Sequence, residues 1–205
     1  MNVVLANRQR IRKINRRLLK QIAAALLSDL KVEAAELGVH LVAAPEIIRL
    51  NEQFLRHAGP TDVIAFDHSN SSSGTFWWGE ATDEPAREDA RPTGSRKTYH
   101  HSNSRRRTRD PGPKTPGPRR QLHGEIFICV DEAVRQARKF RASWQSEITR
   151  YLVHGVLHLL GHDDSRPAVR RKMKLAENRR LRELSRRFSL AHLARPDKLS
   201  PCKNH

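Results

Sequence analysis

Two histidines in the C-terminal third of the chain, His154 and His158, have the spacing of a metal-binding pair. They stand four residues apart in a run of helix-favouring apolar residues, and residues i and i+4 lie on one face of a helix, about one turn apart. Gly161 follows, and glycine tolerates the positive φ with which many helices end and turn back. The turn can return a third ligand from one of the next three residues: His162, Asp163 or Asp164. Three protein ligands with an open fourth position are typical of a catalytic zinc site.

The residue after the first histidine argues against peptide hydrolysis. A zincin peptidase places a glutamate there as its general base, whereas this chain has Gly155. Of the hydrolytic chemistries that such an ion supports, a metallopeptidase-like one is therefore disfavoured.

Composition limits the classes to which the protein can belong. The chain has 205 residues, of which 37% are apolar, which predicts one domain with a core and some polar appended segments. Its two cysteines make a disulfide framework improbable and fit a reducing, cytoplasmic compartment. No apolar run approaches 18 residues, so no membrane span and no membrane partner is expected.

The formal net charge of +17 is concentrated in three stretches. Residues 1–28 hold seven Lys/Arg and no acid, residues 85–120 hold eleven and three acids, and residues 166–187 hold ten and two acids. A solvated surface explains any one of them, but three in one chain favour a polyanionic partner such as nucleic acid. In the last stretch, the residues expected to contact a nucleic-acid substrate are Arg170, Arg171 and Lys174.

The hydrophobic periodicity predicts strands and helices that together position the histidine pair. Strands are expected at 2–7, 36–43, 61–66 and 124–130. Helices are expected at 10–26, 45–55, 131–140, 143–160 and 166–188.

Residues 67–120 differ sharply in composition from the rest of the chain. They are rich in Ser, Gly, Pro and Arg, and Phe76-Trp77-Trp78 is their only apolar cluster. Such a segment buries too little surface to offset its ordering entropy. It is predicted to be a long disordered insertion between the third and fourth strands. Residues 189–205 are predicted to be a flexible tail.

Three groups of residues resemble the YbeY-type ribosomal RNA maturation endoribonucleases. The first is Leu50-Asn51-Glu52-Gln53-Phe54-Leu55-Arg56 followed by the stretch 60–66, and the second is Gly124-Glu125-Ile126-Phe127-Ile128. The third and most specific is the stretch 154–164, with Met173 and Glu177 downstream. Together they cover about residues 1–66 and 122–185.

The resemblance implies a single α+β domain over residues 1–188, with a small, mixed but mostly antiparallel four-stranded sheet packed by about five helices. It implies one Zn²⁺ per chain and cleavage of single-stranded RNA. It further implies maturation of the 3′ end of small-subunit ribosomal RNA and ribosome quality control. The implied partners are ribosomal RNA and the small ribosomal subunit, with an assembly GTPase or ribosomal proteins.

The resemblance also suggests roles for individual residues. The family commonly has tyrosine and histidine where this chain has His162 and Asp164. Asp164 stands six residues after His158, the spacing of the family's third ligand, so the expected metal site is His154, His158 and Asp164. Arg56 matches the arginine of the family's Leu-Asn-x-x-x-x-Arg stretch, and its planar fork suits a phosphate. The residues expected to be catalytic are Arg56, His154 and His158.

Two function classes stand beside the disfavoured metallopeptidase. One is a zinc-dependent endoribonuclease. The other is an RNA-binding ribosome assembly factor whose metal is structural and whose nuclease activity is weak or absent.

Overall fold

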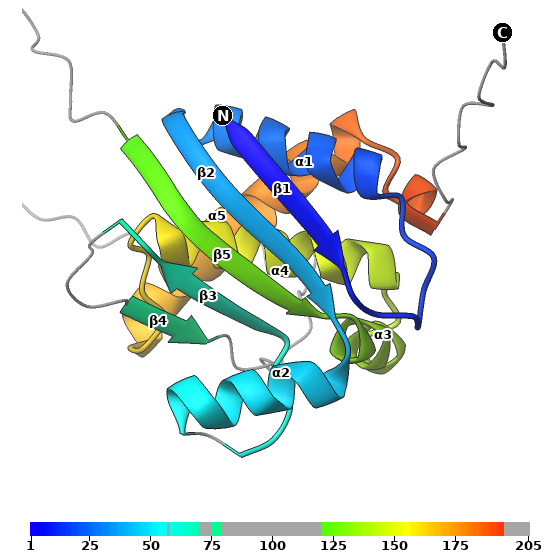
Figure 1. Cartoon of the computed structure of the whole chain (residues 1–205). Helices are drawn as coiled ribbons and strands as arrows, with labels where there is room; N and C mark the ends of the chain where they lie inside the picture. Colours follow the sequence, from blue (N-terminus) through cyan, green and yellow to red (C-terminus); the bar gives the residue numbers. More distant parts are fainter. Residues whose placement is uncertain (57, 70–74, 79–119, 195–205) are drawn as a thin grey trace, which may run out of the picture. The chain divides into compact units, whose positions relative to one another are not determined.

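A five-stranded sheet forms the centre of the computed structural model, with the main layer of helices against one of its faces (Figure 1). The structure describes residues 1–56, 58–69, 75–78 and 120–194. The strands are β1 (Asn2–Asn7), β2 (Val32–Val42), β3 (Val63–Asp67), β4 (Thr75–Trp78) and β5 (Arg120–Cys129). The helices are α1 (Arg16–Asp29), α2 (Ala44–Leu50), α3 (Val130–Lys139), α4 (Trp144–Leu159) and α5 (Pro167–Arg187). Two short helical segments are the π-helix η1 (Asn51–Leu55) and the 3-10 helix η2 (Leu190–Ala194).

The strands are ordered β1-β2-β5-β3-β4 in a mixed sheet. β1 pairs with β2 and β2 with β5 in parallel, while β3 pairs antiparallel with both β5 and β4. The α+β class, the mixed sheet and the five main helices are confirmed. The expectation of a mostly antiparallel sheet is wrong because two of these four pairings are parallel. The connection from β1 to β2 contains helix α1, and a helical crossover returns the chain in the parallel direction.

β4 is a fifth strand that the sequence did not predict. It lies within the stretch predicted to be disordered, and it pairs with β3 from Ile64↔Trp78 to Asp67↔Thr75. Three of its four residues are aromatic, a composition that favours strands, and β3 offers it an open edge. The prediction of disorder is therefore wrong for 75–78. For 70–74 and 79–119 it lies outside the described residues.

The first residues of the predicted flexible tail are ordered. Residues 190–194 form η2, in which Leu193 is buried, and the Leu193 carbonyl accepts a hydrogen bond from the Asn15 N–H at 2.9 Å. One buried leucine within a polar stretch is too weak a pattern to predict such docking. The rest of the predicted tail, 195–205, is outside the described residues.

The main core lies between the sheet and the layer formed by α1, α4 and α5 (Figure 1). Ile126 and Ile128 of β5 pack there with Leu152 and Val156 of α4, all fully buried. A smaller cluster, which includes Ile47, Ile64 and Phe127, fills the space between the other face of the sheet and α2. α4 is thus a central helix, and it is the one that carries the histidine pair. Among the described residues, no helix is both long and apolar enough to span a bilayer.

α4 lies unusually close to β5 at Gly155. A Cβ atom at this position would lie 2.9 Å from Ile126 Cγ2 and 3.0 Å from Ile126 Cδ1. Position 155 therefore faces the sheet. The helix needs glycine at position 155 to lie against Ile126. This is the position at which a zincin peptidase has its glutamate general base, so the packing strengthens the argument against a peptidase.

Candidate metal centre

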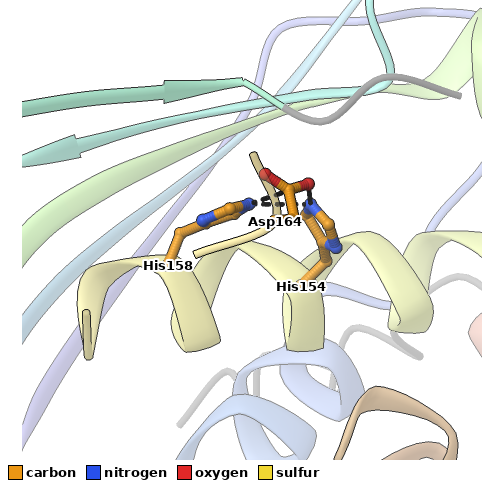
Figure 2. Close-up of side chains that lie close together, drawn as sticks. All are labelled: His154, His158 and Asp164. Atoms are coloured by element: carbon orange, nitrogen blue, oxygen red, sulfur yellow. Dashed lines mark hydrogen bonds and ion pairs between the residues drawn. The ribbon is translucent and has the colours of Figure 1, made fainter. Parts of the chain in front are cut away.

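The two histidines lie together on one face of α4, as their spacing predicts (Figure 2). Ser143 caps the start of this helix, its side chain accepting a hydrogen bond from the Ser146 N–H at 3.2 Å. The His154 and His158 Nε2 atoms are 3.0 Å apart. The His158 side chain is 1% exposed and that of His154 is 16% exposed. The pair is thus largely buried, with its open side at His154.

The end of α4 returns the third candidate ligand. Gly161 has a φ of 83°, and its N–H donates to the His158 carbonyl at 2.8 Å. The His162 N–H donates to the Leu157 carbonyl at 3.0 Å, so the helix ends in a Schellman motif. After this turn the Asp164 carboxylate faces the pair (Figure 2), with Oδ2 3.7 Å from His158 Nε2 and 3.9 Å from His154 Nε2.

Hydrogen bonds at the other ring nitrogens set the tautomers of the pair. His154 Nδ1 lies 3.1 Å from Glu177 Oε2, and His158 Nδ1 lies 2.9 Å from the His162 carbonyl. Both partners are acceptors, so each Nδ1 carries its hydrogen and each neutral ring directs an Nε2 lone pair at the other. Two lone pairs at 3.0 Å repel unless a cation or proton lies between them.

The spacing of the three donor atoms fits a metal ion. Zinc bonds of about 2.0–2.1 Å in tetrahedral geometry separate neighbouring ligand atoms by about 3.3–3.4 Å. The three separations here, 3.0, 3.7 and 3.9 Å, bracket that value. Among the described residues, His154, His158 and Asp164 are the one group of this kind. Two imidazoles and one carboxylate are a donor set used by catalytic zinc and by non-haem iron.

The electrostatics of the site favour a positive charge between the side chains. Burial, reinforced by the charge of His154, lowers the pKa of His158 to about 4, so His158 is neutral near pH 7. Burial also disfavours the charged form of His154, but the hydrogen bond and charge of Glu177, with Asp62 and Asp164, raise its pKa overall. Burial raises the pKa of Asp164 as well. A bound cation would be attracted to the facing lone pairs and would stabilise the charged form of the half-buried Asp164 carboxylate.

Arg150, Glu177 and the carbonyl of His162 also shape the centre, and the sequence predicted no role for them. Glu177 appeared only as part of the family pattern. In the structure it accepts from His154 Nδ1 and from Arg150 Nη1, the latter at 2.7 Å. Arg150 precedes His154 by four residues, so it shares the helix face of the histidines. That shared face was the available signal.

The structure brings one of the predicted substrate-binding residues next to the centre. Arg170, on α5, donates from Nε to the Asp164 carbonyl at 2.9 Å. Arg171 is exposed and Lys174 is half-buried on the following turn. Arg56 is exposed at the end of η1, with a left-handed φ of 56°, and is not part of the metal group. The roles of these four residues towards a substrate stay predictions.

Fold and site together define an α+β domain with a two-histidine, one-aspartate centre at the end of its central helix. A family model described as "Endoribonuclease YbeY" matches residues 4–185. The chain belongs to the YbeY family, as its motifs suggested.

Curated relatives named "Endoribonuclease YbeY" support this assignment. The one from Myxococcus xanthus is 31% identical over 167 residues, which is 82% of this chain but 42% of the relative. The one from Nocardioides is 30% identical over 139 residues, or 68% of each chain. The one from Frankia alni is 28% identical over 182 residues, covering 88% of this chain and 81% of the relative.

A solved structure has a similar fold. The solution structure of TM1509 from Thermotoga maritima aligns with a TM-score of 0.53 at 17% identity, over 99% of this chain and all of the other. At this identity the likeness concerns the fold alone.

Proposed function

We propose that the chain is a zinc-dependent, single-strand-specific endoribonuclease that matures the 3′ end of small-subunit ribosomal RNA. The observation that carries the proposal is the convergence of two imidazole lone pairs and one carboxylate at the end of α4. Membership of a family whose curated relatives are named endoribonucleases supplies the reaction class.

The number and exposure of the ligands favour a catalytic ion over a structural one. Structural zinc sites are closed by four protein ligands, whereas catalytic sites keep one position open. Here three side chains converge, and Asp164 is 24% exposed at the rim. An assembly factor with a purely structural metal would be expected to close its site.

The residues of the chain would divide the work as follows. His154, His158 and Asp164 would hold the ion, which when bound lowers the pKa of a coordinated water or polarises a phosphoryl oxygen. Arg170 uses its Nε on the Asp164 carbonyl, which leaves its terminal nitrogens to donate to a phosphate beside the ion. Arg56 would supply a second guanidinium to the substrate.

The neighbouring part of α5 suits the backbone of a nucleic acid. Five Lys/Arg and no acid lie between Asp164 and Glu177. Lys174 would continue the phosphate contacts from Arg170, since residues four apart on a helix lie on one face, about 6 Å apart along its axis. Arg171 would add a contact from the adjacent face of the helix. The proposed partners are ribosomal RNA and the small ribosomal subunit, with an assembly GTPase or ribosomal proteins, in the cytoplasm.

The test compares the wild type with His158→Ala, and uses His192→Ala as a control because His192 is exposed on η2. Zinc content is measured together with cleavage of a small-subunit ribosomal RNA precursor and of a duplex that covers the same site. Wild type and His192→Ala should bind zinc and cut only the single strand, and His158→Ala should do neither. Zinc binding without cleavage in the wild type would instead support the assembly factor.

A further inference from the structure

A chain of buried charges lies directly behind His154. Arg150 Nη1 donates to Glu177 Oε1 at 2.7 Å, and the other oxygen, Oε2, lies 3.1 Å from His154 Nδ1. Glu147 extends the chain, its Oε2 3.5 Å from Arg150 Nε. The Glu177 side chain is 9% exposed and that of Arg150 is 22% exposed. The carboxylate thus gives one oxygen to each α4 partner.

We propose that Glu177, held by Arg150, is the positioning residue that orients His154 for the metal. Its carboxylate fixes the hydrogen on Nδ1, so that the Nε2 lone pair faces His158 and Asp164. The inference rests on the metal centre of the proposed function. It adds that this centre depends on a carboxylate that never touches the ion.

The two histidines have different supports. His158 donates to a neutral carbonyl, that of His162, whereas His154 donates to a carboxylate. A carboxylate makes the imidazole a stronger donor to a metal than a carbonyl does, and losing such a partner typically weakens metal binding about 10–100-fold. His154 is also the more exposed of the pair. Packing therefore holds the His154 ring less completely than the His158 ring, which leaves more of its orientation to Glu177.

Arg150 makes this arrangement stable in the interior. A buried carboxylate without a partner is strongly destabilising, and the Arg150 guanidinium neutralises Glu177 while occupying the oxygen that His154 does not use. Because Arg150 and His154 are four residues apart on α4, both reach the same carboxylate on α5. The ion pair therefore joins the two helices at the level of the metal.

A purely structural ion pair would hold α5 to α4 without affecting the metal. Glu177→Gln distinguishes a structural ion pair from a residue that supports His154 as a metal ligand. The amide oxygen can still accept a hydrogen bond from His154, while the negative charge that strengthens the ring as a ligand is lost. Glu177→Ala removes both, and Arg150→Met removes the residue that holds the carboxylate. Glu183→Gln is the matched control, since it removes a carboxylate from α5 that pairs with Arg179 and Arg180 and lies away from the metal group.

The experiment titrates each metal-free protein with Zn²⁺ against a chromophoric chelator, with circular dichroism to confirm folding and the Co²⁺ spectrum to report ligand geometry. Zinc affinity should fall about tenfold in Glu177→Gln and about a hundredfold in Glu177→Ala. Arg150→Met should lie between them, and Glu183→Gln should match the wild type.

Two outcomes would overturn these ideas separately. If wild type binds zinc and folded Glu177→Gln and Glu177→Ala bind it equally well, the positioning role is wrong and the metal centre stands. If wild type binds no zinc, the proposed function fails, and the positioning role fails with it.

Discussion

The third ligand of the candidate centre is a carboxylate at a position where the family commonly has histidine. Asp164 Oδ2 lies within 3.9 Å of both Nε2 atoms, whereas His162 offers His158 its backbone carbonyl. Asp164→Ala should therefore lower zinc affinity far beyond the roughly 10–100-fold typical of a lost supporting residue. His162→Ala keeps the carbonyl and should have little effect, and Asp164→His should restore binding.

The measurement is zinc affinity by chelator competition, with the three variants side by side. A carboxylate also lowers the net positive charge of the site relative to three imidazoles and makes it more tolerant of harder ions such as manganese. Loss of metal from His162→Ala, with retention in Asp164→Ala, would show that the assignment of the third ligand is wrong.

Only part of this site could be predicted from the sequence. The pair formed by His154 and His158 could be predicted because helix geometry alone places residues i and i+4 on the same face. Asp164 was assigned because it has the spacing of the third ligand in the family that the chain resembles, and the structure places it in the group. Glu177 lies 23 residues from His154, and its contact depends on how α5 packs against α4, which no local pattern encodes. The hydrogen-bond partners of the two histidines could therefore not be predicted from the sequence.

Asp62 should give the metal-free protein a distinctive pH dependence. Burial raises its pKa from 3.8 to about 7, against the opposing charge of His154. The folded state thus holds a proton that the unfolded state releases between pH 4 and 7, so the contribution of Asp62 to stability is full below pH 4 and is lost as the pH rises through 7. The maximum change is about 4 kcal/mol, from about 1.4 kcal/mol per pKa unit.

Asp62→Asn removes this titration while leaving an oxygen to accept from the Val63 N–H, which donates to Asp62 Oδ1 at 2.9 Å. Urea unfolding of metal-free wild type and variant between pH 4.5 and 8 should show the variant gaining stability relative to wild type as the pH rises. Parallel curves would mean that Asp62 titrates near its ordinary pKa.

At the scale of elements, the packing of α4 on β5 depends on Gly155. An alanine Cβ would lie 2.9–3.2 Å from three atoms of the fully buried Ile126. Overpacking of a core costs about 1–3 kcal/mol, which outweighs the roughly 1 kcal/mol that alanine gains over glycine in a helix. Gly155→Ala should therefore destabilise the protein by up to about 2 kcal/mol, as measured by urea unfolding.

Ile126→Ala provides the control, because it removes all three of the atoms that crowd position 155. In that background Gly155→Ala should cost less than it does alone, and the difference is the coupling between the two sites. An equal cost in both backgrounds would place the strain elsewhere than at the contact with β5.

At the scale of the whole molecule, the order of elements was more predictable than the pairing of strands. The long periodic segments predicted α1, α4 and α5, but β4 was missed because four residues in a polar stretch carry too little pattern. The parallel β2·β5 pairing joins residues about 87 apart, as in Gly38↔Glu125. Such a pairing is selected by the packing of the whole domain, which the sequence pattern of either strand does not contain.

The distribution of charge over the molecule predicts how RNA binding responds to salt. If Arg170, Arg171 and Lys174 each neutralise one phosphate, the logarithm of affinity should lose about 0.7 per contact for each tenfold rise in salt on single-stranded RNA. Reversing all three to glutamate should therefore flatten the slope by about two. The slope is measured by filter binding or fluorescence anisotropy of a single-stranded ribosomal RNA fragment over a range of salt concentrations.

A matched control separates these contacts from a general effect of net charge. Arg138, Lys139 and Arg141 are exposed where α3 connects to α4, and their reversal changes the net charge of the chain by the same amount. This control should weaken binding through the overall field of the protein but leave most of the salt slope in place, because counterions are released only where phosphates are contacted. Equal slopes in the two triple variants would remove the first turns of α5 from the RNA-binding surface.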